Sequence, residues 1–148
     1  MTVGEVCSRE VVIISSNESV LVAAKLMRQY HVGDLVVVEE REGKRVPVGI
    51  LTDRDIVVKI LAQELDPPHL RVSEVMSAEI ETIGENDEVF FAADRMRASG
   101  VRRLPVIGHD GGLVGIVTLD DLIDLLAEEL RLLATVATRQ QRREPHRI

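Results

Sequence analysis

The chain has 148 residues, enough for one domain or two small fused units that bury roughly two-thirds of the unfolded surface. Apolar residues make up 45% but aromatic residues only 2%, so the core must consist of Val, Leu, Ile and Ala. A net charge of −7 argues against a nucleic-acid platform over the whole surface, and the single cysteine excludes an internal disulfide. No apolar run approaches the roughly 18 residues of a membrane span, and residues 1–10 lack a signal pattern. We therefore expect a cytoplasmic protein with no membrane partner.

The chain contains an internal repeat. Residues 3–8 (VGEVCS) return as residues 72–77 (VSEVMS), and residues 20–27 (VLVAAKLM) return as residues 89–96 (VFFAADRM). Gly49 pairs with Gly115 because the first copy has three extra residues in a turn. The sequence therefore predicts two copies of one unit at residues 1–65 and 71–130. Between them lies a proline-containing linker, residues 66–70, and residues 131–148 form a C-terminal extension.

Each copy is predicted to fold as β-α-β-β-α, which gives an α/β (α+β) fold. The first strands are expected at residues 11–14 and 80–83. The helix that follows has apolar positions at Val20, Leu21, Ala24 and Met27, and at residues 89, 90, 93 and 96 of the second copy. Glycine-containing turns then join residues 35–38 to 46–51 and residues 104–107 to 113–117. One copy alone leaves its helix faces uncovered, so we expect the two to share a core.

A short motif ends the last strand of each copy and opens the helix that follows. Residues 49–56 (GILTDRDI) and 115–122 (GIVTLDDL) each contain the Thr-x-x-Asp pattern of a helix capping box. One interpretation is a helix start and nothing more. The other is a binding site, in which the free N–H groups of the helix start attract an anion and the aspartate holds ribose hydroxyls.

With these motifs, residues 2–130 resemble a tandem pair of CBS domains, named after cystathionine beta-synthase and also called a Bateman module. The resemblance rests on the VGEVCS/VSEVMS, HVGDLVVV/GVRRLPVI and GILTDRDI/GIVTLDDL pairs. It implies that the repeats pack about a pseudo-twofold axis and leave two clefts. Such clefts often bind AMP, ADP, ATP or S-adenosylmethionine, with no cofactor required. The family places the aspartate on the ribose, the threonine toward phosphate and apolar strand residues against the base.

Carried over to this chain, the resemblance predicts two unequal clefts. The first cleft would comprise Ile50, Thr52, Asp55, Ile80, Glu81, Arg102 and Arg103. The second would comprise Cys7, Val11, Val12, Gly33, Asp34, Ile116, Thr118 and Asp121. A carboxylate about 4 Å from a phosphate costs on the order of 1 to 4 kcal/mol. We therefore expect a phosphorylated nucleotide to prefer the first cleft, and the second to be empty or to take a neutral or cationic adenosyl ligand.

Three of these positions have a second interpretation. Arg102 and Arg103 could instead lie in solvent or pair with a carboxylate. Cys7 is expected to be a small apolar filler near the cleft entrance, with a redox role as the alternative.

Sequence motifs for catalysis and metal binding are missing. The chain has no phosphate-binding G-x-x-x-x-G-K-S/T loop, its four histidines lack zinc-ligand spacing, and no nucleophile has an evident base. We therefore expect a non-enzymatic regulatory module that senses an adenosyl ligand and acts on an unidentified partner protein. The alternatives are a ligand-free structural dimerisation or adaptor module, and an enzyme that turns over the bound nucleotide.

The last helix is predicted to continue through residues 122–137 (LIDLLAEELRLLATVA). Residues 122–126 are expected to pack in the core, whereas the apolar positions beyond Leu130 favour a partner helix, most simply from a second copy in a twofold dimer. Bateman modules commonly pair into a disc of four CBS domains. Residues 139–148 carry four arginines against one glutamate and are expected to be disordered at their end. A nucleic-acid role for this tail is the weaker alternative to a solvated tail.

Overall fold

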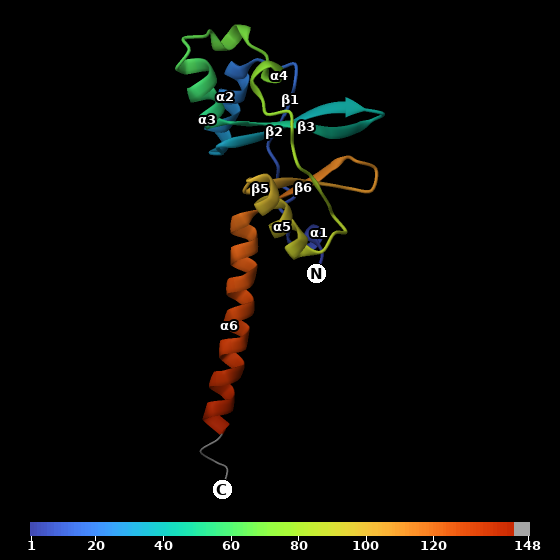
Figure 1. The fold of residues 1–148 in the computed structure, drawn as a ribbon, viewed down its shortest axis with the longest axis vertical. Coiled ribbons are helices and arrows are strands. Elements are labelled where there is room, and N and C mark those ends of the chain that lie inside the picture. Colours follow the sequence, from blue (N-terminus) through green and yellow to red (C-terminus); the bar gives the residue numbers. More distant parts are fainter. Residues whose placement is uncertain (144–148) are drawn as a thin grey trace.

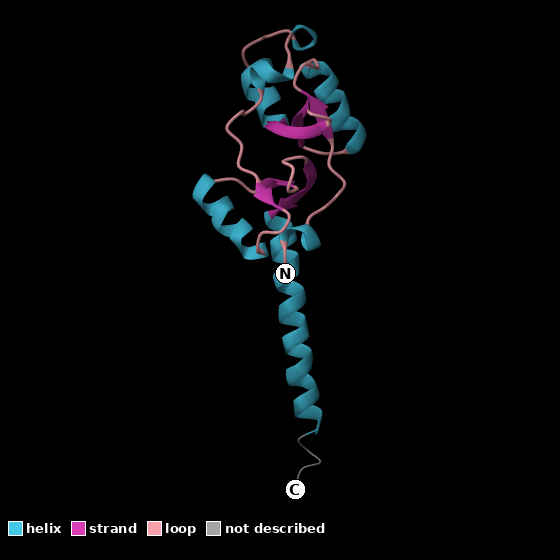
Figure 2. Cartoon of the chain, turned by 90° about the vertical axis from the view of Figure 1, so that its right-hand side faces the viewer, coloured by secondary structure: helices cyan, strands magenta, loops and turns pink. Residues whose placement is uncertain are grey.

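The structure, a computed structural model, describes residues 1–143. Two three-stranded sheets lie in the middle of the body, with most of the helices on their outer sides, and one long helix projects away (Figures 1 and 2). The first sheet has the order β1 (Ile13–Ser15), β2 (Asp34–Arg41), β3 (Lys44–Thr52). The second has the order β4 (Ile83–Gly84), β5 (Arg103–Ile107), β6 (Leu113–Thr118). The mixed fold built from two copies is confirmed.

The two sheets have the same topology. In each, the first strand is parallel to the second and the second is antiparallel to the third. The predicted first strands at residues 11–14 and 80–83 are wrong in extent, because β1 begins at Ile13 and β4 at Ile83. In the second copy, the late start of the strand has a chemical cause. The Val36 N–H donates to the Val12 carbonyl at 3.2 Å, but the equivalent of Val36 is Pro105, which has no N–H to donate.

The main helix of each unit is α2 (Val20–Tyr30) or α5 (Val89–Ser99). Each follows a polar capping residue and is ended by a residue with left-handed backbone conformation. The Ser19 hydroxyl caps α2 by accepting from the Val22 N–H at 3.2 Å. His31 and Gly100 end the two helices with positive φ angles of 54° and 67°.

The predicted buried face of these helices is partly wrong. The buried positions are Val20, Ala23 and Met27, with Val89, Ala92 and Met96 in the second copy. Phe90, predicted to face the core, is 40% exposed. The buried stripe therefore follows i, i+3, i+7, and an alanine at its centre allows the helix to approach the sheet closely.

Each core is completed by a short helix from the other repeat. Val3 in α1 (Val3–Val6) is fully buried in the core of the second sheet. Val72 and Val75 in α4 (Val72–Val75) are buried in the core of the first sheet. Main-chain hydrogen bonds hold this exchange, because the Val3 N–H donates to the Asp87 carbonyl at 2.9 Å and the Val72 N–H to the Glu18 carbonyl at 2.8 Å. The two repeats are thus mutually dependent for burial.

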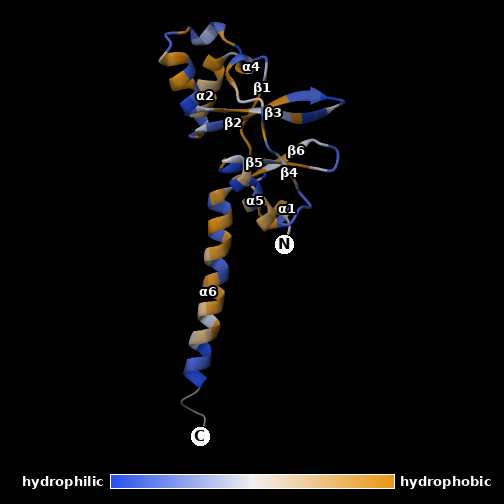
Figure 3. Cartoon of the chain, in the orientation of Figure 1, coloured by the Kyte–Doolittle hydropathy of each residue, from blue (hydrophilic) through white to orange (hydrophobic). Residues whose placement is uncertain are grey.

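The remaining helices differ strongly in length. After β3 come α3 (Asp53–Asp55) and a π-helix, η1 (Ile56–Leu61), and the prolines form a single 3-10 turn, η2 (Pro67–His69). After β6 comes α6 (Leu119–Arg143), which has 25 residues. Figure 3 shows apolar residues continuing along α6 well beyond the body. Within the described part of the chain, none of the helices combines the length and apolar content needed to cross a bilayer.

Core packing along α6 ends earlier than predicted. Leu122 is 3% exposed and Leu125 packs against the second core, but Leu126 is 47% exposed. The prediction of a core position at Leu126 is therefore wrong. The predicted disorder at the end of the tail falls on residues 144–148, which lie outside the described residues.

Candidate ligand cleft

A cleft of about 820 Å³ opens between the two repeats, at the end of β3. All seven residues of the predicted first cleft line it: Ile50, Thr52, Asp55, Ile80, Glu81, Arg102 and Arg103. The main chain joins its two sides, because Ile50 and Ser77 exchange hydrogen bonds of 3.1 and 3.0 Å. This volume lies within the roughly 300–1,000 Å³ typical of small-molecule pockets. Chain segments far apart in sequence therefore form one cavity large enough for a ligand.

Sequence reasoning missed six lining residues of the first cleft. They are Arg54, Ser77, Glu79, Ser99, Gly100 and Val101. Two signals could have found some of them. Arg54 lies inside the Thr-x-x-Asp motif, and Ser77 ends the repeated VSEVMS segment. With the additional residues the cleft has three arginines and three acidic side chains, so its lining is mixed in charge and not simply basic.

The predicted capping box is present at Thr52 and Asp55. The Thr52 N–H donates to Asp55 Oδ2 at 3.0 Å, and the Asp55 N–H donates to Thr52 Oγ1 at 3.1 Å. The second copy has the same pair of bonds between Thr118 and Asp121, at 2.9 and 3.2 Å. Both motifs therefore fix the start of a helix.

The expectation of free N–H groups at this helix start is wrong. The Asp53 N–H donates to the Gly33 carbonyl at 2.9 Å, and the Arg54 N–H donates to Asp53 Oδ1 at 2.8 Å. The Asp55 N–H is taken by Thr52, as described above. The first amides of a helix normally lack partners, but here the loop and the side chains satisfy them. The amides at the start of α3 are therefore not available to an anion in this cleft.

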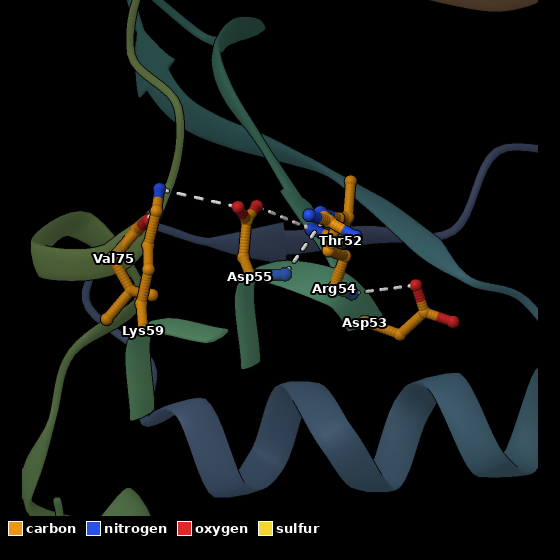
Figure 4. A network of polar contacts seen from close by, with 6 residues as sticks. All are labelled: Thr52, Asp53, Arg54, Asp55, Lys59 and Val75. Atoms are coloured by element: carbon orange, nitrogen blue, oxygen red, sulfur yellow. Dashed lines mark hydrogen bonds and ion pairs between the residues drawn. The ribbon is translucent and has the colours of Figure 1, made fainter. Parts of the chain in front are cut away.

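The Asp55 carboxylate also pairs with a lysine. Asp55 Oδ1 lies 3.3 Å from Lys59 Nζ, which donates in turn to the Val75 carbonyl at 3.1 Å (Figure 4). The Asp55 side chain is 19% exposed. The residue equivalent to Lys59 in the second copy is Leu125, so the sequence supports this link in the first copy alone. A hydroxyl pair that binds Asp55 would therefore share Oδ1 with Lys59.

Two arginines of the first cleft, Arg102 and Arg103, pair with carboxylates. Arg103 lies 3.0 Å from Asp34 Oδ1, and these side chains are 35% and 20% exposed. Arg102 lies 3.7 Å from Asp120, but both of those side chains are largely exposed. Burial raises the pKa of the Asp34 carboxyl, while the guanidinium of Arg103 lowers it in part and the nearby Asp53 adds to the rise. Asp34 and Arg103 occupy equivalent positions of the two repeats, so this ion pair joins them.

Two of the eight residues of the predicted second cleft, Val11 and Val12, line a second pocket in the described part of the chain. This smaller pocket has a volume of about 550 Å³ and is also lined by Glu10, Ile13, Leu26, Tyr30 and Val32. The other six predicted residues, all within the described part of the chain, do not line it: Cys7, Gly33, Asp34, Ile116, Thr118 and Asp121. Asp34 is engaged with Arg103, and the Ser8 N–H donates to the Ile116 carbonyl at 2.9 Å.

Cys7 behaves as an apolar filler. It packs against the second core, and burial raises the pKa of its thiol above the ordinary value. A raised pKa disfavours the reactive thiolate, which argues against the redox alternative. Within residues 1–143, no group of three or more His, Cys, Asp or Glu side chains is arranged to hold a metal ion.

The family model for the CBS domain matches this chain twice, at residues 3–62 and 72–128. The chain belongs to the CBS domain family. The CBS domain-containing protein YhcV of Bacillus subtilis is 39% identical over 121 residues, which cover 82% of both proteins. Protein MK0525 of Methanopyrus kandleri is 36% identical over 136 residues, which cover 92% of this chain and 66% of that protein.

A solved CBS-domain structure is also similar. The CBS domain pair of protein MJ0100, in complex with 5′-methylthioadenosine and S-adenosyl-L-methionine, is 30% identical and has a TM-score of 0.73. The match covers 87% of this chain and 98% of that one. The resemblance inferred from the sequence motifs is thus confirmed at the level of family and fold.

Proposed function

We propose that this CBS-domain pair binds an adenosyl compound in the first cleft and signals its occupancy to a partner protein. The observation that carries this proposal is that Asp55, Arg103 and the apolar side chain of Ile80 line one cavity. In such a cavity a carboxylate can accept from ribose hydroxyls, a guanidinium can bind a phosphate, and isoleucine can cover a base. The ligands in the MJ0100 complex support the choice of an adenosyl compound.

Two features favour the first cleft over the second. All seven of its predicted residues line one cavity, and its arginines at positions 102 and 103 correspond to Gly33 and Asp34 of the predicted second cleft. Because the amides at the start of α3 are engaged, phosphate binding depends on these arginines. A phosphate that binds Arg103 competes with Asp34 for it, whereas 5′-methylthioadenosine has no phosphate and does not. AMP, ADP, ATP and S-adenosylmethionine all remain candidates.

Isothermal titration calorimetry with these five compounds tests the proposal. The key variant is Asp55→Asn, because the amide oxygen can still cap the helix at Thr52 while the charge that holds the ribose is removed. A hydrogen bond to a charged group contributes about 1.5–3 kcal/mol, so we expect affinity to fall about 10- to 150-fold. Asp121→Asn is the matched control, since it removes the equivalent carboxylate outside the first cleft, and it should change affinity by less than about threefold.

Binding should also stabilise the fold. A ligand at a hundred times its Kd adds about 2.7 kcal/mol to the free energy of unfolding. This corresponds to a rise in Tm of about 5–10 °C for a chain of this size. Chromatography of the recovered ligand should show it unchanged, whereas a new product would favour the enzyme hypothesis. If none of the five compounds releases heat or raises Tm, the sensor proposal is wrong.

The second candidate function is a dimerisation or adaptor module without a ligand. The large exposed apolar side chains of α6 favour it, because Leu130, Leu133 and Val136 are 60–66% exposed. It differs from the sensor proposal in one measurable respect. An adaptor keeps its oligomeric state and its partner when the first cleft is altered by Asp55→Asn, whereas a sensor loses its ligand response.

A further inference from the structure

The outer part of α6 has no packing partner in the described chain. Every residue from 126 to 143 is exposed, and the helix extends away from both sheets (Figures 1 and 2). Most of the stability of a helix in a protein comes from packing of its apolar face rather than from the helix alone. Several large apolar side chains along it are nevertheless exposed, as the orange bands of Figure 3 show. This part of α6 therefore needs a partner that packs along it.

The exposed apolar side chains have the spacing of a coiled coil. Ile123, Leu126, Leu130, Leu133 and Ala137 follow one another at alternating steps of three and four residues. This is the a/d pattern that packs two helices side by side. The first four side chains are 47–66% exposed, so the seam is open. Around the helix it is displaced from Leu125, which packs against the body, and it borders the buried Leu122.

Charge is divided between the two halves of α6. The first half carries Asp120, Asp121, Asp124, Glu128 and Glu129, and the second half carries Arg131, Arg139, Arg142 and Arg143. The helix dipole favours acids at the start and bases at the end, but its influence falls off within the first and last turns. It does not account for Asp124, Glu128, Glu129 or Arg139. A partner helix with the opposite order of charges would complement all of them.

We propose that α6 pairs with α6 of a second copy of this chain as an antiparallel coiled coil. In the register that places Leu130 opposite the partner's Leu133, Leu126 lies opposite the partner's Ala137. The same register sets Asp124 level with the partner's Arg139, and the acidic half of each helix along the basic half of the other. A parallel pair would align like charges instead. The two bodies then lie at opposite ends of the coiled coil.

This assembly goes beyond the proposed ligand function and does not depend on it. The seam begins where α6 leaves the body, and none of its residues lines the first cleft. Each chain would keep its own first cleft at its own end of the dimer. The dimer and ligand binding can therefore fail independently, and each has its own measurement.

Sedimentation equilibrium of the full chain tests the seam. Leu133→Asp places a carboxylate in it, and Leu132→Asp places the same group on the next residue, outside it. The wild-type side chains at 132 and 133 are 61% and 65% exposed, so the pair is closely matched. We expect Leu133→Asp to raise the dimer dissociation constant about 100-fold or more and Leu132→Asp to change it by less than about threefold. A monomeric wild-type chain, or equal effects of the two variants, would overturn the proposal.

Disulfide trapping tests the orientation. Cys7→Ser removes the single native cysteine, and Leu126→Cys and Ala137→Cys are then made in separate chains that differ in tag length. In the antiparallel dimer, mild oxidation of the mixture should yield mainly the 126–137 product between unlike chains. Preferential 126–126 and 137–137 products would show a parallel pair and overturn the orientation. Calorimetry with 5′-methylthioadenosine on Leu133→Asp should give unchanged affinity, which separates failure of the dimer from failure of the ligand proposal.

Discussion

Replacing Asp34 with asparagine should strengthen the binding of AMP to the first cleft. Arg103 lies 3.0 Å from the Asp34 carboxylate and also lines that cleft. A phosphate that binds Arg103 must therefore displace or share a carboxylate that already holds it. Asparagine preserves the shape of the side chain and removes the charge. The variant thus frees the guanidinium with little change in packing.

The size of this effect follows from the burial of the ion pair. Fully exposed pairs contribute about 0–1 kcal/mol, whereas loss of one partner from a buried pair costs about 3–5 kcal/mol. The Asp34 and Arg103 side chains are 20% and 35% exposed, so we place their coupling between these limits, at about 1–2 kcal/mol. The Kd for AMP should accordingly fall about 5- to 30-fold in Asp34→Asn.

Calorimetric titration of AMP and 5′-methylthioadenosine into both proteins measures the effect. The thioether ligand has no phosphate, so its Kd should be the same in wild type and Asp34→Asn. Asp120→Asn is the control variant, because Asp120 lies 3.7 Å from Arg102 and is 80% exposed, and it should shift AMP affinity by less than about twofold. AMP binding that is unchanged or weaker in Asp34→Asn would show that Arg103 does not bind the phosphate.

Two further predictions concern stability. Val3→Ala should lower the free energy of unfolding by about 2 kcal/mol and Tm by about 4–8 °C, because Val3 is fully buried in the second core. Val22→Ala, at an exposed site, is the control. Equally small effects of the two variants in thermal melts would refute the idea that α1 completes the core of the other repeat. The raised pKa of Asp34 favours its neutral form in the fold, so its contribution to stability is present at acid pH and lost as pH rises through that pKa. As pH rises from 4 to 7, the free energy of unfolding of Asp34→Asn, measured by urea denaturation, should therefore increase relative to that of wild type. A decrease relative to wild type would contradict this.

Features that depend on local sequence could be predicted. The repeat, the helices at residues 20–30 and 89–99, and both capping boxes follow from periodicity and from side chains three residues apart. The seven residues of the first cleft came from the family resemblance, and the structure brings them together. Their role in binding stays a prediction, as does the division of the chain at residues 65, 70 and 130.

Features that depend on the packing of one repeat against the other were missed. Nothing in VGEV or VSEV indicates which core receives Val3 or Val72, because either core could bury a valine. The Asp34–Arg103 pair was missed although its signal was available. These residues lie at equivalent positions of the repeat, and equivalent residues near a pseudo-twofold axis meet each other. Arg103 was assigned to the first cleft and Asp34 to the second, but the two side chains form one ion pair between the repeats.

The same comparison explains why one cleft is the better candidate site. The two copies retain equivalent cores, but they differ at Lys59 and Leu125, at Arg102 and Gly33, and at Arg103 and Asp34. A duplicated unit needs both cores for stability but only one cleft for a single ligand. Arg103 takes its counterpart Asp34 as an ion-pair partner, so the side chain proposed to bind a phosphate is also held by the other repeat. If Arg103 binds the phosphate, the affinity for a nucleotide depends in part on this contact between the repeats, and the bound ligand changes that contact.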